Sequence, residues 1–186
     1  MVLSLGAACT GGGPVTIAAS GPTAPARDPA ATKTCTSPAA GYSVGYPATW
    51  FTVGDGPVPC RFFDPRPFRL PADTEVTGLS IVAEMVPVSF DEIVPPAPDQ
   101  GDPRVLDRRE ERLTGRRALR IDTRTTGGGL LPARGHRVTW YLDAGAGTFV
   151  ATTTAADTGE SSATPVDVLD RMVASLRLLA AAPEQA

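Results

Sequence analysis

The second half of the chain alternates apolar and polar residues in paired runs that short turns join. Residues 105–125 carry Thr114-Gly115 at their middle, and residues 136–154 carry a glycine-rich turn at 143–147. Alternation places one face of each run in a core, and a short turn between two such runs is typical of an antiparallel hairpin. The pattern therefore predicts an antiparallel sheet, which needs a second layer over its apolar face.

A helix near the C-terminus is predicted to form that layer. Thr164 is a suitable N-cap, Pro165 suits the first helical position, and Asp167 stands where a capping box has its acid. Apolar residues then recur at helical spacing. They are Val166, Leu169, Met172, Val173 and Leu176.

The first half of the chain adds shorter elements. Residues 42–46, 50–53 and 79–86 read as strands, and residues 89–93 read as a short helix that prolines end. The expected fold class is α+β: a mostly antiparallel sheet of about six or seven strands, with the C-terminal helix and the short mid-chain helix packed on it.

The three cysteines bear on the compartment. Cys9 ends Leu5-Gly-Ala-Ala-Cys and precedes a glycine-rich stretch, which resembles a bacterial lipoprotein signal. The resemblance implies that Cys9 is diacylated and becomes the mature N-terminus, on the outer face of the cytoplasmic membrane. No charged n-region precedes the small residues, so we expect the true start to lie upstream of Met1. The alternative is a cytosolic protein with a chance Ala-Ala-Cys.

Cys35 and Cys60 remain to pair with each other. An oxidising envelope favours a disulfide between them, and two buried, reduced thiols are the alternative. Two cysteines and the single histidine, His136, make an incomplete tetrahedral zinc site, so no metal is expected. No other cofactor is predicted.

Four regions follow from composition. Residues 1–8 are the remnant of the lipoprotein signal, and residues 9–34 are a Gly-, Pro- and Ala-rich tether that lacks large apolar side chains. Residues 35–179 are the folded domain, and residues 180–186 are a frayed tail.

The folded region resembles bacterial envelope lipoproteins of the high-GC Gram-positive type that have a PsbP-like domain. The resemblance rests on Gly41-Tyr-Ser-Val-Gly-Tyr-Pro-Ala-Thr-Trp50, on the turn in residues 113–120, and on the helix in residues 168–176. It spans about residues 41–178. It implies the α+β fold and a non-catalytic assembly, stability or binding role, and it offers no catalytic residue to carry over.

Charge and codon bias exclude one class of partner. The net charge is −3, Lys33 is the one lysine among 17 basic residues, and asparagine is absent. Arginine in place of lysine indicates a high-GC bacterial genome, so the arginines alone do not indicate phosphate recognition. A basic nucleic-acid binder is excluded, and we expect a monomer.

Two segments are candidate partner contacts. The first is residues 61–70, interpreted as a loop that carries aromatic and cationic side chains. Its candidate residues are Arg61, Phe62, Phe63, Arg66 and Phe68. The alternative is that the phenylalanines fill one edge of the core and the prolines stiffen the loop.

The second segment is residues 104–124, which hold eight arginines and four acidic residues. On two antiparallel strands these would form a charged outer face, with Arg116, Arg117 and Arg120 as candidate contacts for an anionic partner. The alternative is a solvated face with cross-strand ion pairs.

The leading hypothesis is a non-enzymatic, lipid-anchored envelope protein that acts as a binding or assembly module. Its partners are the membrane, through the anchor, and an envelope protein or an apolar ligand. A second hypothesis is a carrier that holds an apolar small molecule or lipid between helix and sheet. A hydrolase is a remote third, because His136 has no Gly-x-Ser-x-Gly nucleophile near it. No catalytic residue is predicted.

Overall fold

The structure, a computed structural model, describes residues 31–55, 58–70, 79–97, 104–128, 131–155 and 165–179. Cys9, the predicted signal remnant and tail, and almost all of the predicted tether lie outside these residues. So do the predicted N-cap Thr164 and the side chain of His136.

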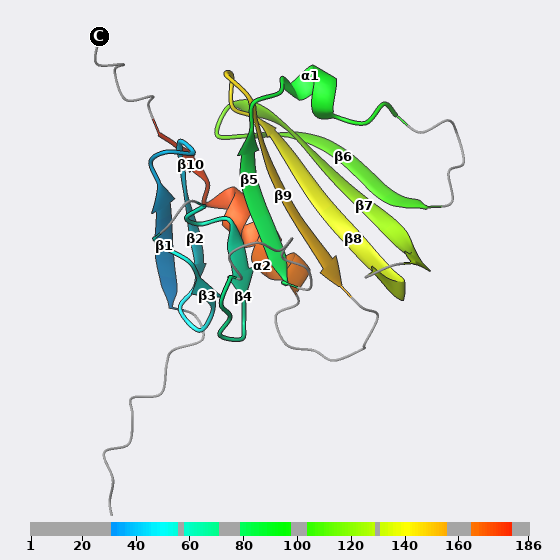
Figure 1. The fold of residues 1–186 in the computed structure, drawn as a ribbon. Helices are drawn as coiled ribbons and strands as arrows, with labels where there is room; N and C mark the ends of the chain where they lie inside the picture. The colour runs from blue at the N-terminus through cyan, green and yellow to red at the C-terminus, as the bar shows by residue number, and fades with distance from the viewer. Residues whose placement is uncertain are drawn as a thin grey trace, which may run out of the picture.

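Two antiparallel sheets form the described fold (Figure 1). The smaller sheet has the order β1-β2-β10, from β1 (Thr32–Ser37), β2 (Tyr42–Pro47) and β10 (Arg177–Leu178). The larger has the order β3-β4-β5-β9-β8-β7-β6. Its strands are β3 (Phe51–Thr52), β4 (Phe62–Asp64), β5 (Ile81–Val86), β6 (Val105–Leu113), β7 (Arg116–Gly128), β8 (Leu131–Asp143) and β9 (Thr148–Ala155).

Two helices complete the described elements, α1 (Phe90–Ile93) and α2 (Pro165–Ala174). Figure 1 shows α2 behind β4 and β5, and it packs on β9 of the larger sheet and β2 of the smaller one. The fold is therefore α+β and mostly antiparallel, with a C-terminal and a mid-chain helix, as predicted. Among the described residues, no helix is long and apolar enough to cross a membrane.

Both predicted hairpins are confirmed. Leu113 pairs with Arg116 across a two-residue turn, in which Thr114 and Gly115 both have positive φ (52° and 83°). In the two-residue hairpin turn whose twist matches that of the flanking strands, both central residues have positive φ. The second hairpin pairs Asp143 with Thr148 around Gly145, which also has positive φ.

Three strands depart from the sequence-based predictions. β1 begins at Thr32, so the last residues assigned to the tether belong to the domain. β4 lies inside the segment that was predicted to be a loop, and β10 follows α2 directly. Strands as short as β3, β4 and β10 show no alternation of apolar and polar residues that the sequence could reveal. β4 is a strand because it pairs with β3 on one side and with β5 on the other.

The core has two parts because β7 is buried on both faces. The main part lies between α2 and the sheets, where the predicted stripe of α2 meets Val138, Trp140 and Leu142 of β8. The second part lies under α1 and contains Phe90, Leu119 and Ile121. Leu119 and Ile121 are buried, and they face α1, on the side of the sheet opposite α2.

Candidate functional site

A disulfide joins Cys35 of β1 to Cys60, which is separated from β4 by Arg61 alone. The Cα atoms are 5.6 Å apart, and both residues are buried. The predicted pairing is therefore confirmed, and the alternative of two reduced thiols is wrong. Structural disulfides are typical of proteins outside the cytoplasm, so this is an extracytoplasmic α+β protein.

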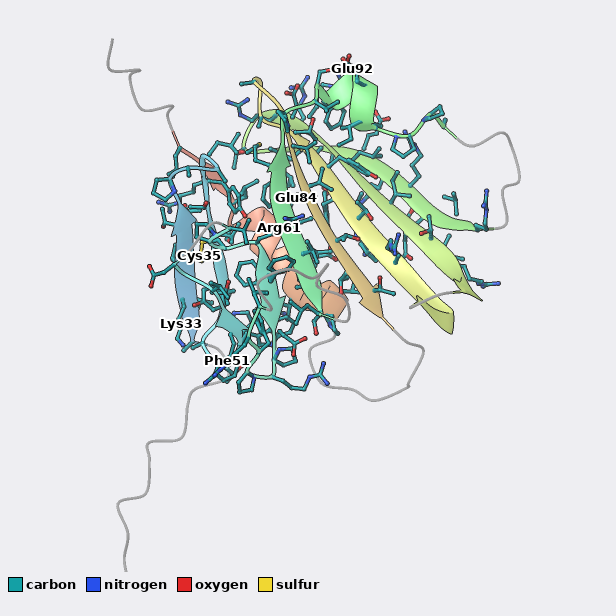
Figure 2. All side chains as sticks on the ribbon, viewed as in Figure 1. Lys33, Cys35, Phe51, Arg61, Glu84 and Glu92 are labelled. Carbon is teal, nitrogen blue, oxygen red and sulfur yellow. A yellow bond between two sulfur atoms is a disulfide. The ribbon has the colours of Figure 1, made fainter. Side chains whose placement is uncertain are left out.

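A pocket of about 320 Å³ lies beside this disulfide, where the smaller sheet meets the larger one. Three parts of the chain line it: the end of β1 with the following turn and the first residue of β2, the segment before β4, and β5. The lining residues are Ser37, Ala39, Ala40, Tyr42, Val58, Pro59, Arg61, Ala83, Glu84 and Met85. Figure 2 shows Arg61 and Glu84 side by side, with Cys35 on the neighbouring β1.

Tyr42 connects the two sheets below the pocket. Its hydroxyl lies 3.0 Å from the carbonyl oxygen of Cys60 and 3.1 Å from that of Ala83, and its ring meets the Phe149 ring edge-on. Burial raises the pKa of Tyr42 to about 12; the charge of Glu84 adds to this, and that of Arg61 opposes it. The phenol therefore stays protonated at neutral pH and can donate to these carbonyl oxygens.

Arg61 and Glu84 supply the charge of the pocket. The Arg61 Nη2 atom lies 2.7 Å from Glu84 Oε2, and the two side chains are 39% and 40% exposed. The guanidinium also lies over the Phe62 ring, 5.2 Å from its centroid. Since Arg61 and Glu84 are the only charged residues in the described lining, the pocket has a net charge near zero, and its two charges are paired with each other.

Two buried polar atoms of the lining residues have no hydrogen-bond partner. They are the hydroxyl oxygen of Ser37, a fully buried residue, and Nε of Arg61. A buried donor without a partner is costly, so it calls for a compensating group. Both atoms have almost no accessible surface, so they lie behind the pocket wall and are not exposed in the pocket.

The remaining candidates in residues 61–70 divide into core and surface residues. Phe62 and Phe63 lie in β4 and are buried, so they cannot contact a partner at the surface. They agree with the alternative interpretation, in which the phenylalanines fill one edge of the core. Phe68 is half-buried. Arg66 is exposed, and its Nε donates to Asp64 at 3.1 Å.

The three arginines of β7 do not form one outer face. Arg117 points toward α1, where it pairs with Asp91 at 2.9 Å and lies over the Phe90 ring. Arg120 is buried on the α2 side, where its Nε donates to Asp170 of α2 at 3.1 Å. Arg116 is exposed and reaches the carbonyl oxygen of Asp143. The predicted charged face is thus divided between the two sides of the sheet, because successive residues of a strand point in opposite directions.

Asp64 is a buried carboxylate that orders the start of the 61–70 segment. It accepts hydrogen bonds from the backbone N–H groups of Arg66 and Ser80, from Arg66 Nε and from the Ser80 hydroxyl, at 2.9–3.1 Å. Burial alone would raise the pKa of Asp64, but these hydrogen bonds outweigh it and hold the pKa below its ordinary value of 3.8.

This lowered pKa predicts an acid-sensitive stability. The carboxylate form is favoured in the folded state, so its contribution is present above the unfolded-state pKa and is lost as pH falls through the folded-state pKa. We expect Asp64→Asn to lower the free energy of unfolding most at pH 7, with the difference from the wild type shrinking below pH about 4. Urea unfolding of both proteins between pH 7 and pH 3 measures it. A difference that does not change with pH would contradict the prediction.

Sequence analysis did not find Ser37, Tyr42 and Glu84 as site residues. They come from β1, β2 and β5, and only the packing of the two sheets brings them to Arg61. The sequence did contain one signal for this site. A disulfide between Cys35 and Cys60 places Arg61, the residue after Cys60, close to β1. The residues described form no group of three His, Cys, Asp or Glu side chains that could hold a metal ion.

Comparisons with known proteins add little to this description. No protein-family model matches the chain, and no curated protein matches it. Solved structures do match, among them the crystal structure of a protein from Bacteroides thetaiotaomicron, with a TM-score of 0.46 and 15% sequence identity. The match covers 78% of this chain and 48% of that one. We infer nothing further from a similarity this weak.

Proposed function

We propose that this extracytoplasmic protein is a non-enzymatic binding or assembly module of a bacterial envelope, anchored to the outer face of the cytoplasmic membrane by a lipid on Cys9. The pocket beside the disulfide is its contact site. Of the contact residues predicted from the sequence, Arg61 lines this pocket. We also propose that the domain is PsbP-like and comes from a high-GC Gram-positive bacterium, as the sequence resemblance implies.

The observation that carries the binding role is the pocket of about 320 Å³ beside the disulfide, whose lining places the partly exposed Arg61–Glu84 ion pair among apolar side chains. Cys35–Cys60 supports the compartment that a lipid anchor requires. The Ala-Ala-Cys9 sequence and the composition of residues 10–31 support the anchor and the tether.

The carrier hypothesis, with an apolar ligand between helix and sheet, gains no support from that interface. Side chains fill it: Leu169 and Met172 of α2 are almost fully buried against Trp140 and Phe149 of the sheet. The hydrolase hypothesis depends on His136, whose side chain lies outside the described residues. Neither hypothesis is therefore preferred here.

Membrane fractionation tests the anchor. Full-length protein expressed in a high-GC Gram-positive host should be found with the membranes and carry an acyl mass on Cys9. We expect Cys9→Ser to remove both the acyl mass and the membrane association. A wild-type protein without an acyl group would overturn the anchor and leave the binding role to its own test.

Photo-crosslinking in intact cells tests the contact site. A photoreactive benzoylphenylalanine at the exposed, pocket-lining Ala39 should form an adduct with the bound molecule, small or large, which intact mass analysis detects. The same group at Ala146, on the exposed β8–β9 turn, is the matched control. We expect an adduct from position 39, none from position 146, and loss of the adduct when Arg61→Ala is added. Equal labelling at both positions, or none at either, would overturn the site.

A further inference from the structure

We propose that the α1-side face of the larger sheet binds a phosphate group through Arg108 of β6 and through Arg137 and Tyr141 of β8. This site goes beyond the proposed function, because it shares no residue with the pocket beside the disulfide. Its residues also differ from the contact residues predicted from the sequence. Three observations support it: the placement of the three side chains on one open face, their unused donors, and the positive charge around them.

The register of the sheet places the three side chains on one face. Arg108 is opposite Ile121, and Ile121 is opposite Thr139. Residues opposite each other in antiparallel strands point to the same face, and so do residues two apart along one strand. Arg137 and Tyr141 are each two residues from Thr139, so they lie on the same face. The three side chains therefore surround Ile121 and Thr139 from two sides.

This face of the sheet is open beyond α1. In Figure 1 it is turned toward the viewer, with α2 behind the sheet and α1 at its upper end. Of the two described helices, only α1 lies on this face, where its Phe90 packs with Ile121. Arg137 is exposed, and Arg108 and Tyr141 are half-buried, so a ligand can reach all three side chains from solvent.

The polar groups of these side chains are unused. Among the described residues, the Arg108 side chain has no ion pair or hydrogen bond, and Tyr141 Oη has no hydrogen-bond partner. The Arg137 side chain has one long hydrogen bond, from its Nε to Thr154 Oγ1 at 3.5 Å. None of these donors is a buried polar atom without a partner, so they are accessible to a ligand.

Positive charge surrounds the Tyr141 hydroxyl. Burial raises the pKa of Tyr141 above its ordinary value, and the positive charges of Arg137 and Arg108 oppose this rise. Charges influence a pKa strongly only from nearby, so both guanidinium groups lie close to the hydroxyl. The phenol stays protonated at neutral pH and can donate a hydrogen bond. On β6, Glu110 shares this face, and within the described part of the chain it forms no ion pair with either arginine.

Donors that approach from separate positions favour a phosphate over a carboxylate. A carboxylate has two oxygens in one plane, and a single guanidinium can bind both of them. A phosphate has its oxygens in a tetrahedral arrangement, so two guanidinium groups and a phenol can each bind a different oxygen. A soluble phosphodiester and the headgroup of an anionic phospholipid both supply this group.

Nuclear magnetic resonance titration of the oxidised, full-length Cys9→Ser protein tests the site. Inorganic phosphate should shift the amide signals of Ile121 and Thr139 in a saturable way, whereas sodium chloride at the same ionic strength should not. Glycerophosphoglycerol and vesicles of phosphatidylglycerol distinguish the two sources. Tighter binding of the vesicles assigns the site to a lipid headgroup, and equal binding of both assigns it to a soluble phosphodiester.

Four variants assign the binding to the proposed side chains. Arg108→Gln and Arg137→Gln should each weaken binding by about tenfold or more, the effect of one hydrogen bond from a charged group. Tyr141→Phe keeps the packed ring and should weaken binding by about three- to tenfold. Arg109→Gln is the matched control, because Arg109 is exposed on β6 and points to the opposite face. It should bind like the Cys9→Ser protein.

Two results would overturn this inference. The first is that neither the soluble phosphate compounds nor the vesicles bind. The second is that Arg108→Gln and Arg109→Gln have equal effects, because binding would then not depend on which face carries the arginine. Neither result bears on the lipid anchor or on the pocket, which membrane fractionation and the crosslink at Ala39 test separately.

Discussion

Replacing both Cys35 and Cys60 by alanine should lower the free energy of unfolding by about 3–4 kcal/mol, the loop-entropy value for cysteines 25 residues apart. The bond stabilises the fold because it restricts the unfolded chain. It joins β1, the edge of the smaller sheet, to the segment that leads into the larger sheet. Urea unfolding of the oxidised wild type and of the double variant measures the difference.

Cys9→Ala is the matched control for this experiment. It removes a cysteine outside the described domain, so the unfolding midpoint of the oxidised protein should stay that of the wild type. The reductant dithiothreitol should lower the stability of the wild type and of the control to the same extent. A double variant that loses less than about 1 kcal/mol would contradict the entropic account of this disulfide.

The second large effect is expected at Asp170, which joins α2 to the larger sheet. Its Oδ1 accepts from Arg120 Nε at 3.1 Å and from Trp140 Nε1 at 2.7 Å. The Arg120 side chain is only 10% exposed, so removing Asp170 leaves a buried guanidinium without its nearest acceptor. Asp107 and Asp122 lie farther away, at 3.7 and 4.0 Å from Arg120 Nη1. We expect Asp170→Ala to cost about 2–3 kcal/mol, below the full value for a buried pair because Asp170 is partly exposed.

An ion pair on the surface provides the control. Asp91 pairs with Arg117 at 2.9 Å, and their side chains are 77% and 52% exposed. Asp91→Ala should cost less than about 1 kcal/mol, because solvent screens exposed pairs. Asp170→Asn keeps an acceptor for Trp140 without the charge and should be intermediate between wild type and Asp170→Ala. Equal losses for Asp91→Ala and Asp170→Ala would show that Arg120 does not depend on Asp170.

The candidate site shows how far sequence patterns reach. Arg61 was found because an arginine among aromatic residues is visible in a short window of sequence. The Cys35–Cys60 pair was found because these two cysteines remain once Cys9 is assigned to the lipoprotein signal. Ser37 and Glu84 carried no such signal. Ser37 ends a six-residue strand, and Glu84 occupies an ordinary polar position of an alternating strand. Their role depends on the pairing of β4 with β5 and on the packing of the smaller sheet beside them.

The sequence by itself determined the two long hairpins, the start of α2 at Pro165 with its apolar stripe, and the α+β class. Period, turn chemistry and the preference of proline for the first helical position act between residues close in the chain. Tertiary structure alone decided that β4 is a strand, that Arg120 is buried against α2, and that a pocket with a paired Arg61 and Glu84 exists. Each depends on contacts between residues distant in the chain. An arginine at an alternating position looks the same whether its strand face meets water or a helix, and only the fold decides between them.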